Sequence, residues 1–140
     1  MSKFIISGFA DEIDSYIDRQ MDVLDGLGIR YIEIRGADGK NVSKLLEREA
    51  LEMAERLSAR GYKISAIGSP IGKIKVTDDF EPHLELFRHC LRLAKIFDAK
   101  YIRMFSFYPP EGEKIEDYRD EVMRRWESFL NAAQNRSEER

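Results

Sequence analysis

The sequence alternates four times between a short apolar stretch and a longer segment whose apolar residues recur at helical spacing. In the first long segment, Ile17, Met21 and Leu24 recur every three or four residues, which is the spacing of one helix face. Strands that alternate with helices in this way predict βα units, right-handed crossovers and a parallel sheet. The expected strands are 4–9, 31–35, 63–68 and 100–107, and the expected helices are about 15–27, 43–57, 80–94 and 115–133.

The length and composition of the chain predict one globular domain. Its 140 residues suffice for a sizeable core, and no linker or shift in composition divides them. We therefore expect one α/β domain over 1–134 and a polar tail over 135–140 that frays. Hydrophobic residues make up 43% and charged residues 35%, with a net charge of −3. This balance excludes a basic surface for nucleic acid, and the apolar runs are too short to span a membrane.

The cysteine content and the N-terminus bear on the cellular compartment. Cys90 is the single cysteine, so neither an intrachain disulfide nor a cysteine-based zinc site can form. The first residues contain one lysine and then become acidic, unlike a signal peptide. Together these features predict a protein of the reducing cytoplasm.

Several common catalytic motifs are absent. The sequence has no phosphate-binding GxxxxGK[ST], no G-x-S-x-G nucleophile elbow and no HExxH zinc motif. Gly26 and Gly28 follow an expected helix, so they predict a helix end rather than a dinucleotide loop. His83 and His89 fall in the third expected helix, away from the strand ends. We expect both at the surface or in helix packing, not as ligands.

Two expected strands carry a charged residue on the face turned away from the helices. Side chains alternate along a strand, so Glu33 points away from Ile32 and Arg103 points away from Ile102. A guanidinium left unpaired in a dry interior costs several kcal/mol. A doubly wound sheet would cover this face with helices and would have valine or leucine there.

In a (β/α) barrel, by contrast, this second face is the barrel interior. Its side chains form layers contributed by alternate strands, and the second and fourth strands are both even. Glu33 and Arg103 are therefore expected to share a layer near the mouth, where Arg103 pairs with Glu33 or points at a ligand. A purely structural ion pair is the equal alternative.

Further polar residues follow the carboxyl ends of the strands, where α/β proteins keep their sites. Asp11 and Glu12 follow the first strand, and either they bind a hydroxylated ligand or they are acids at a helix approach. Ser69 and Lys73 follow the third strand in a turn shaped by glycine and proline, and Tyr108 follows the fourth. Lys73 can reach a phosphate or carboxylate, although a solvated loop lysine is the simpler interpretation.

Four segments of the sequence resemble a known family. They read SGFADEID, GIRYIEIRGADGKNV, ISAIGSPIGKI and DAKYIRMFSFY. They are similar to the sugar phosphate isomerase/epimerase family, the xylose isomerase-like TIM barrels, from about residue 4 to 125. The resemblance implies isomerisation or epimerisation of a sugar, or dehydration of a cyclic polyol, beside Mn²⁺ or Mg²⁺. It also implies that Glu33, Ser69, Lys73 and Arg103 shape the substrate pocket.

The resemblance covers only half of the family's fold, because a full barrel has eight strands. The family's metal ligands and glutamate pair come from strands five to eight, so the resemblance assigns no catalytic or metal-binding residue here. It implies the N-terminal half of a sugar or sugar phosphate isomerase, not competent alone, and the final NAAQNRSEER suggests a truncated gene product or a designed half-barrel. The alternative is a non-catalytic oligomerising fragment or a small-polyol-binding module. Open sheet edges and an apolar lumen face predict a homo-oligomer.

Overall fold

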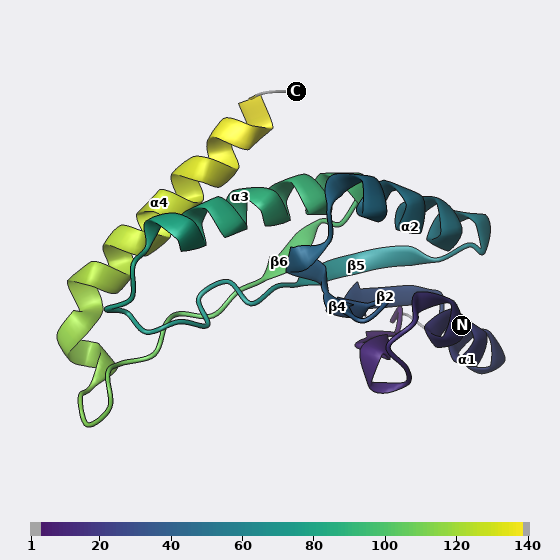
Figure 1. Ribbon diagram of the computed structural model, residues 1–140, viewed down its shortest axis with the longest axis horizontal. Helices are drawn as coiled ribbons and strands as arrows, with labels where there is room; N and C mark the ends of the chain where they lie inside the picture. Colours follow the sequence, from purple (N-terminus) through teal and green to yellow (C-terminus); the bar gives the residue numbers. More distant parts are fainter. Residues whose placement is uncertain (1–3, 139–140) are drawn as a thin grey trace.

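The computed structural model describes residues 4–138, and its elements follow the predicted alternation (Figure 1). The strands are β1 (Ser7–Gly8), β2 (Tyr31–Ile34), β3 (Gly36–Ala37), β4 (Lys40–Asn41), β5 (Lys63–Gly68) and β6 (Tyr101–Arg103). The α-helices are α1 (Ile17–Leu27), α2 (Glu47–Ala59), α3 (Glu81–Ile96) and α4 (Arg119–Glu138). Three 3₁₀ turns are η1 (Ala10–Glu12), η2 (Val42–Lys44) and η3 (Ile115–Tyr118).

The four main strands form a parallel sheet in the order β1-β2-β5-β6. The order follows the chain without a reversal, so right-handed crossovers place all the connecting helices on one face of the sheet. A doubly wound sheet requires a point where the strand order reverses, and this sheet has none among its described strands. The predicted α/β fold with four parallel strands is confirmed, whereas its relation to a closed barrel stays a proposal.

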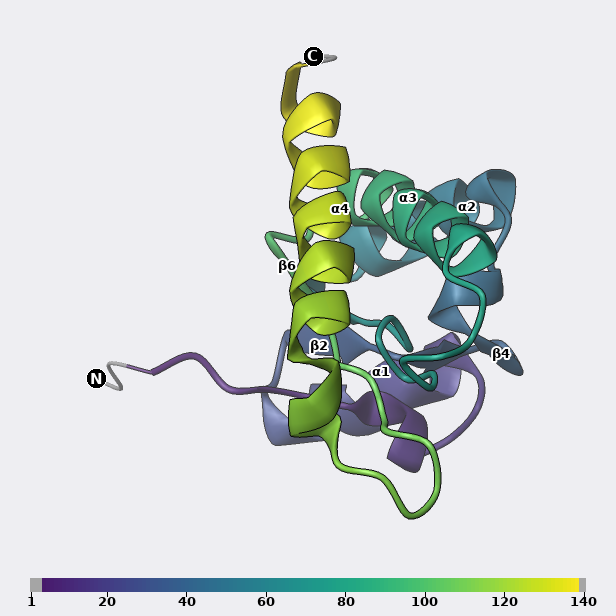
Figure 2. The same cartoon turned by 90° about the vertical axis from the view of Figure 1, so that its left-hand side faces the viewer.

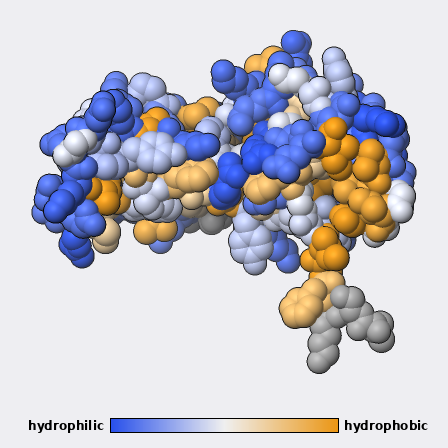
Figure 3. Space-filling view, turned by 90° about the horizontal axis from the view of Figure 1, so that it is seen from below, coloured by the Kyte–Doolittle hydropathy of each residue, from blue (hydrophilic) through white to orange (hydrophobic). Residues whose placement is uncertain are grey.

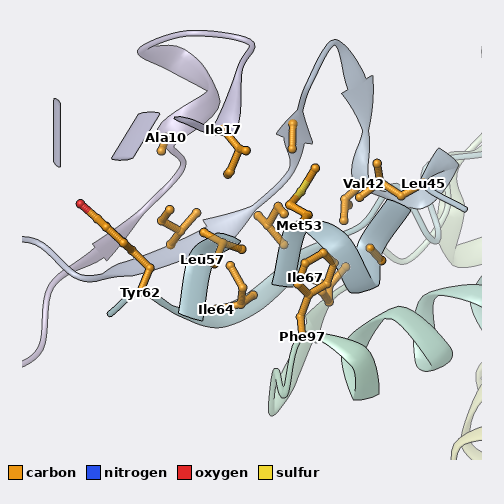
Figure 4. Close-up of a cluster of buried hydrophobic side chains, with 14 of the residues drawn as sticks. Ala10, Ile17, Val42, Leu45, Met53, Leu57, Tyr62, Ile64, Ile67 and Phe97 are labelled. Atoms are coloured by element: carbon orange, nitrogen blue, oxygen red, sulfur yellow. The ribbon is translucent and has the colours of Figure 1, made fainter. Parts of the chain in front are cut away.

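One buried cluster joins the three connecting helices to the sheet (Figure 4). Ile17 of α1 and Met53 of α2 lie in it with Ile64 and Ile67 of β5, and each is at most 6% exposed. Burying one such side chain stabilises a fold by about 1.5–3 kcal/mol relative to leaving it in water. The helices α1, α2 and α3 therefore share one face, and the other face is left for polar and aromatic side chains.

The strand register places the charged residues on that other face. Glu33 is level with Ala66 of β5, and Ala66 is level with Tyr101 of β6. Two residues further along, Gly68 is level with Arg103. Because side chains alternate, Glu33 and Arg103 share the face opposite the buried isoleucines. Tyr101 on this face is 70% exposed.

The first strand is shorter than the predicted 4–9. Only Ser7 and Gly8 pair with β2, at Tyr31 and Ile32. The preceding Phe4, Ile5 and Ile6 are 83%, 69% and 67% exposed. Figure 3 shows apolar side chains gathered where this N-terminal segment leaves the body of the molecule. The prediction is wrong for these residues, because β2 begins at Tyr31, level with Ser7, and the ladder between the two strands starts there.

The fourth strand is also shorter than the predicted 100–107. The strand β6 ends at Arg103, and the chain then pairs with the loop after β5 instead. The amide of Phe105 donates to the carbonyl of Ile71 at 2.7 Å, and that of Phe107 donates to Gly72 at 2.9 Å. Phe107 has a φ of 72°, a left-handed conformation that ends a regular strand.

The second helix begins at Glu47 and not at the predicted residue 43. Asn41 is the reason, because its Oδ1 accepts hydrogen bonds from both the amide and the hydroxyl of Ser43, at 2.9 and 2.7 Å. These bonds hold Val42–Lys44 in a 3₁₀ turn. The helix proper starts after Leu46, whose amide donates to the carboxylate of Glu49 at 2.9 Å.

The last helix, α4, packs against α3 (Figures 1 and 2). The ring of Phe129 lies 4.8 Å from that of Phe87 and 5.2 Å from that of Phe80, centroid to centroid. The helix continues to Glu138, through the first part of the predicted tail 135–140. Residues 139–140 lie outside the described part of the chain, so the predicted fraying is not tested.

Candidate functional site

The carboxyl ends of the strands bring three cationic side chains around two aromatic rings. We call Arg35, Arg103 and Lys73, with the rings of Phe9 and Phe105, the cation cluster. Arg35 follows β2 and lies 4.3 Å from the ring centroid of Phe9. Arg103 ends β6 and lies 5.1 Å from Phe9 and 4.9 Å from Phe105. The ammonium of Lys73 lies 5.2 Å from Phe105. These distances are those of cation–π contacts.

Arg35 is the member of the cluster whose charge is compensated. Its Nε and Nη2 donate to Oδ2 and Oδ1 of Asp11, each at 2.8 Å, in a two-pronged ion pair. A second carboxylate, that of Glu12, lies 3.4 Å from Nη2. The hydrogen bond that Arg35 donates to the Asp11 carboxylate raises the pKa of Arg35, against the opposing effect of burial. The positive charge of Arg35 is therefore largely compensated within the protein.

Arg103 is held by backbone groups instead of a carboxylate. Its Nη2 donates to the carbonyl of Ser69 at 3.2 Å, and the hydroxyl of Ser69 donates to the Arg103 carbonyl at 2.5 Å. The Nε of Arg103 is buried and has no hydrogen-bond partner. Among the side chains of residues 4–134, no carboxylate lies within 4.0 Å of Arg103 or Lys73. The cluster thus retains two uncompensated positive charges.

A glycine makes room for the aromatic part of the cluster. A Cβ on Gly68 would lie 3.0 Å from Cε1 of Phe9 and 3.0 Å from Cβ of Arg35. The missing side chain allows the Phe9 ring to lie on the sheet between the two guanidinium groups. The ring then contacts both arginines at the strand ends.

The structure brings together three of the four predicted site residues. Ser69, Lys73 and Arg103 lie within the cation cluster or against it. Glu33 lies on the same face but one alternation lower, level with Tyr101. Of the two arrangements predicted for Arg103, the ion pair with Glu33 is wrong, since it is not formed among the described residues, and the contact with a ligand stays a prediction. A register shift after Ile32 skips Ser65 of β5 and brings Glu33 level with Ala66, still two residues short of Gly68 and Arg103.

Sequence reasoning missed the roles of Arg35, Phe9 and Phe105. Arg35 shares a face with Glu33 by simple alternation and falls at a strand end, so its position was within reach of the pattern. Its partner was not, because the pairing with Asp11 joins side chains 24 residues apart. Of the two interpretations of Asp11, ligand binding or a local helix effect, neither includes this ion pair.

His83 lies behind the loop that carries Lys73, as a packing residue. It is 8% exposed, and its Nε2 accepts a hydrogen bond from the amide of Gly72 at 2.8 Å. Burial lowers the pKa of His83, as does the nearby charge of Arg125, whereas Asp78 raises it. His89 contacts the carbonyl of Leu45 through Nε2 at 2.7 Å. Both histidines thus have structural partners, as expected.

The described residues fit no metal centre. No three His, Cys, Asp or Glu side chains between residues 4 and 134 gather as metal ligands do. The Mn²⁺ or Mg²⁺ implied by the resemblance is therefore assigned to no residue of this part of the chain.

A separate hollow of about 990 Å³ lies at the opposite end of the sheet. Its lining includes Tyr31, Lys63, Ser65, Lys100 and Tyr101, from the start of the strands. Binding sites in parallel α/β folds form at the carboxyl ends of the strands and not at this end. The cation cluster is therefore the better candidate site.

Comparison of the sequence with models of known protein families and with curated proteins finds no match. In addition, none of the helices within residues 4–138 has the length and apolar character that crossing a membrane requires.

Proposed function

We propose that this chain holds the anionic group of a sugar phosphate, as the first four βα units of a metal-dependent sugar phosphate isomerase or epimerase. The observation that carries the proposal is the pair of uncompensated cations, Arg103 and Lys73, at the carboxyl ends of a one-sided parallel sheet. A face without covering helices is what the interior of a barrel requires. The lone buried Cys90 favours a cytoplasmic setting.

The chemistry of the cluster favours a phosphate over a neutral sugar. A guanidinium presents several donors in a fixed fork that fits phosphate oxygens, and an ammonium adds a compact charge. Contacts with aromatic faces stabilise each cation by about 0.5–2 kcal/mol without neutralising it. Arg103 and Lys73 would bind the anion, and Ser69 would hold Arg103 through its hydroxyl and its carbonyl.

Glu33 and the chemical step complete the proposal. Glu33, lower on the same face, would accept hydrogen bonds from sugar hydroxyls. No proton transfer is assigned to a residue of this chain. Substrate holding is therefore the role that these residues support, and we expect no turnover from the chain alone.

Calorimetric titration with glucose 6-phosphate and with glucose tests the proposal. Arg103→Met and Lys73→Met should each weaken binding of the phosphate ester roughly tenfold, which corresponds to about 1.4 kcal/mol. Lys100→Met, at the other end of the sheet, removes the same charge and should leave the affinity unchanged. Equal binding of glucose and its phosphate, or equal losses in all three variants, contradicts the proposal.

A second candidate function is that of an oligomerising module. The observation that favours it is apolar surface beside sheet edges, with Ile5 and Ile6 exposed next to β1 and Tyr101 exposed in β6. Unpaired strand edges and apolar patches favour association with another copy. This candidate requires no ligand and is compatible with weak polyol binding.

A further inference from the structure

We propose that His83 is a positioning residue for the cation cluster, because its ring nitrogen anchors the turn that carries Lys73. The inference rests on the proposed function only for its consequence, anion binding. The anchoring contact, from the Gly72 amide to Nε2 of His83, is present in the protein without ligand.

The anchored element is the turn from Pro70 to Lys73. The amide of Lys73 donates to the carbonyl of Pro70 at 2.9 Å, and Gly72 has a φ of 85°. Inside this turn, the amide of Gly72 donates to Nε2 of His83 at 2.8 Å. His83 is the third residue of α3 and is 8% exposed, so water competes little for this bond. The helix thereby holds the turn through one side chain.

The turn is coupled directly to the aromatic part of the cluster. Its carbonyls at Ile71 and Gly72 accept hydrogen bonds from the amides of Phe105 and Phe107. A Cβ on Gly72 would lie 1.6 Å from the carbonyl oxygen of Phe105, so the two segments are in close contact. A shift of the turn must therefore move Phe105, against whose ring both Lys73 and Arg103 lie.

The surroundings of His83 favour its neutral form. Arg125 of α4 is 4% exposed, donates to the carbonyl of Asp78 at 2.6 Å and lies 5.2 Å from the Phe107 ring. Burial and the charge of Arg125 lower the pKa of His83, and the carboxylate of Asp78 partly opposes them. Protonation would place an N–H against the Gly72 amide and remove the acceptor. Acid pH should therefore release the turn and misplace Lys73.

The first test is the tautomer of the two histidines, read from ¹⁵N spectra of the protein without ligand. An Nε2 that accepts from Gly72 requires His83 to carry its proton on Nδ1. His89 provides the internal control, because its Nε2 faces the carbonyl of Leu45 and must donate. Opposite tautomers support the inference, and an Nε2–H tautomer at His83 overturns it.

The second test compares two variants by the ring-current shift that Phe105 imposes on the side-chain protons of Lys73. His83→Gln keeps an acceptor and should preserve this shift, whereas His83→Phe should lose it. In a titration with inorganic phosphate, His83→Phe should bind roughly tenfold more weakly, and His83→Gln should stay within about threefold of the parent.

The wild-type protein gives the same information if His83→Phe does not fold. The Gly72 amide and the Lys73 side-chain signals should move together as His83 protonates, at a pH below its ordinary value of 6.5. Lys73 signals that ignore His83 protonation, or a Lys73 shift that persists in His83→Phe, overturn the inference. A wild-type protein that keeps the shift but ignores phosphate contradicts the proposed function alone.

Discussion

At the scale of residues, the two arginines of the cation cluster share one aromatic ring, but a carboxylate compensates the charge of only one of them. Asp11 compensates the charge of Arg35, whereas the side chain of Arg103 donates to the Ser69 carbonyl, which carries no negative charge. The difference follows from the partner and not from the residue type. Asp11 is therefore a determinant of how many positive charges the site presents.

Asp11→Asn should strengthen phosphate binding by roughly threefold to tenfold, because it returns the charge of Arg35 to the cluster. Asp117→Asn makes the same change in net charge within η3 and serves as the control. Titration with inorganic phosphate at constant ionic strength measures both. Equal gains in the two variants would assign the effect to net charge, and a loss in Asp11→Asn would contradict the site.

Gly72 is the backbone position on which the loop depends. It combines a φ of 85° with the Phe105 carbonyl at 1.6 Å from a hypothetical Cβ. Gly72→Ala should lower the free energy of unfolding by about 3 kcal/mol or more, since both strain and overlap oppose it. Gly112→Ala shares the conformation, with a φ of 81°, but has open space, and should cost about 1–2 kcal/mol. Similar losses by urea denaturation would argue against the close contact.

Residue positions on a face could be predicted from the sequence, but residue partners could not. Alternation places Glu33 and Arg103 on one face, and the register confirms it. The ion pair, one of the two arrangements predicted for Arg103, is wrong, because the Arg103 side chain donates to the carbonyl of Ser69, in a loop whose path the sequence does not reveal. The cluster's aromatic members were missed for the same reason. The path of the loop after β5 places the Phe105 ring against Lys73 and Arg103.

At the scale of elements, α4 contacts the loop between β5 and α3, near Asp78 and Phe80. Arg125 joins Glu121 of its own helix to the carbonyl of Asp78, and lies against the ring of Phe80. Helix α4 thus holds the segment that precedes α3 and its residue His83. The apolar spacing of α4 predicted the helix, and its contact with the 70–80 loop emerged only in three dimensions.

The Glu121 carboxylate should make this contact sensitive to acid. Hydrogen bonds from Arg124 and Arg125 lower the pKa of Glu121 from 4.5 to about 2. Its stabilisation is therefore complete above pH 4.5 and is lost as the pH falls toward 2. Urea denaturation across this range should show a smaller pH dependence for Glu121→Gln than for the parent. Parallel curves would show that the ion pairs contribute nothing measurable.

Element types were predictable because apolar periodicity is a local property, whereas element ends were not. The helix α1 starts at Ile17, whose amide donates to Asp38 at 2.9 Å, a contact across 21 residues. The helix α2 starts late because Asn41 holds a 3₁₀ turn. The strand β6 ends early because the amide of Phe105 donates to the carbonyl of Ile71, in the loop after β5.

At the scale of the whole molecule, the sheet has helices on one face and two open edges. The monotonic strand order was predictable from the βα alternation and the handedness of crossovers. An open sheet and a segment of a barrel share this strand order. The exposed side chains beside β1 are the physical consequence of the open edge.

These exposed residues predict association between copies. Size-exclusion chromatography with light scattering should find a dimer or a larger assembly, and Ile5→Lys should shift it toward the monomer. Leu130→Lys, which changes an exposed leucine of α4, is the control for added charge and should leave the assembly intact. A wild-type protein that stays monomeric at high concentration contradicts the association.

The most direct measurement is a residue-resolved ¹H–¹⁵N titration of the wild-type protein with glucose 6-phosphate. If anionic ligands dock at the carboxyl ends of the parallel strands, the amide signals of Gly68, Lys73 and Arg103 move with a common saturation curve. Signals that move only around Tyr31, Lys63 and Tyr101, at the hollow on the opposite end, or a spectrum that does not respond, would contradict the account.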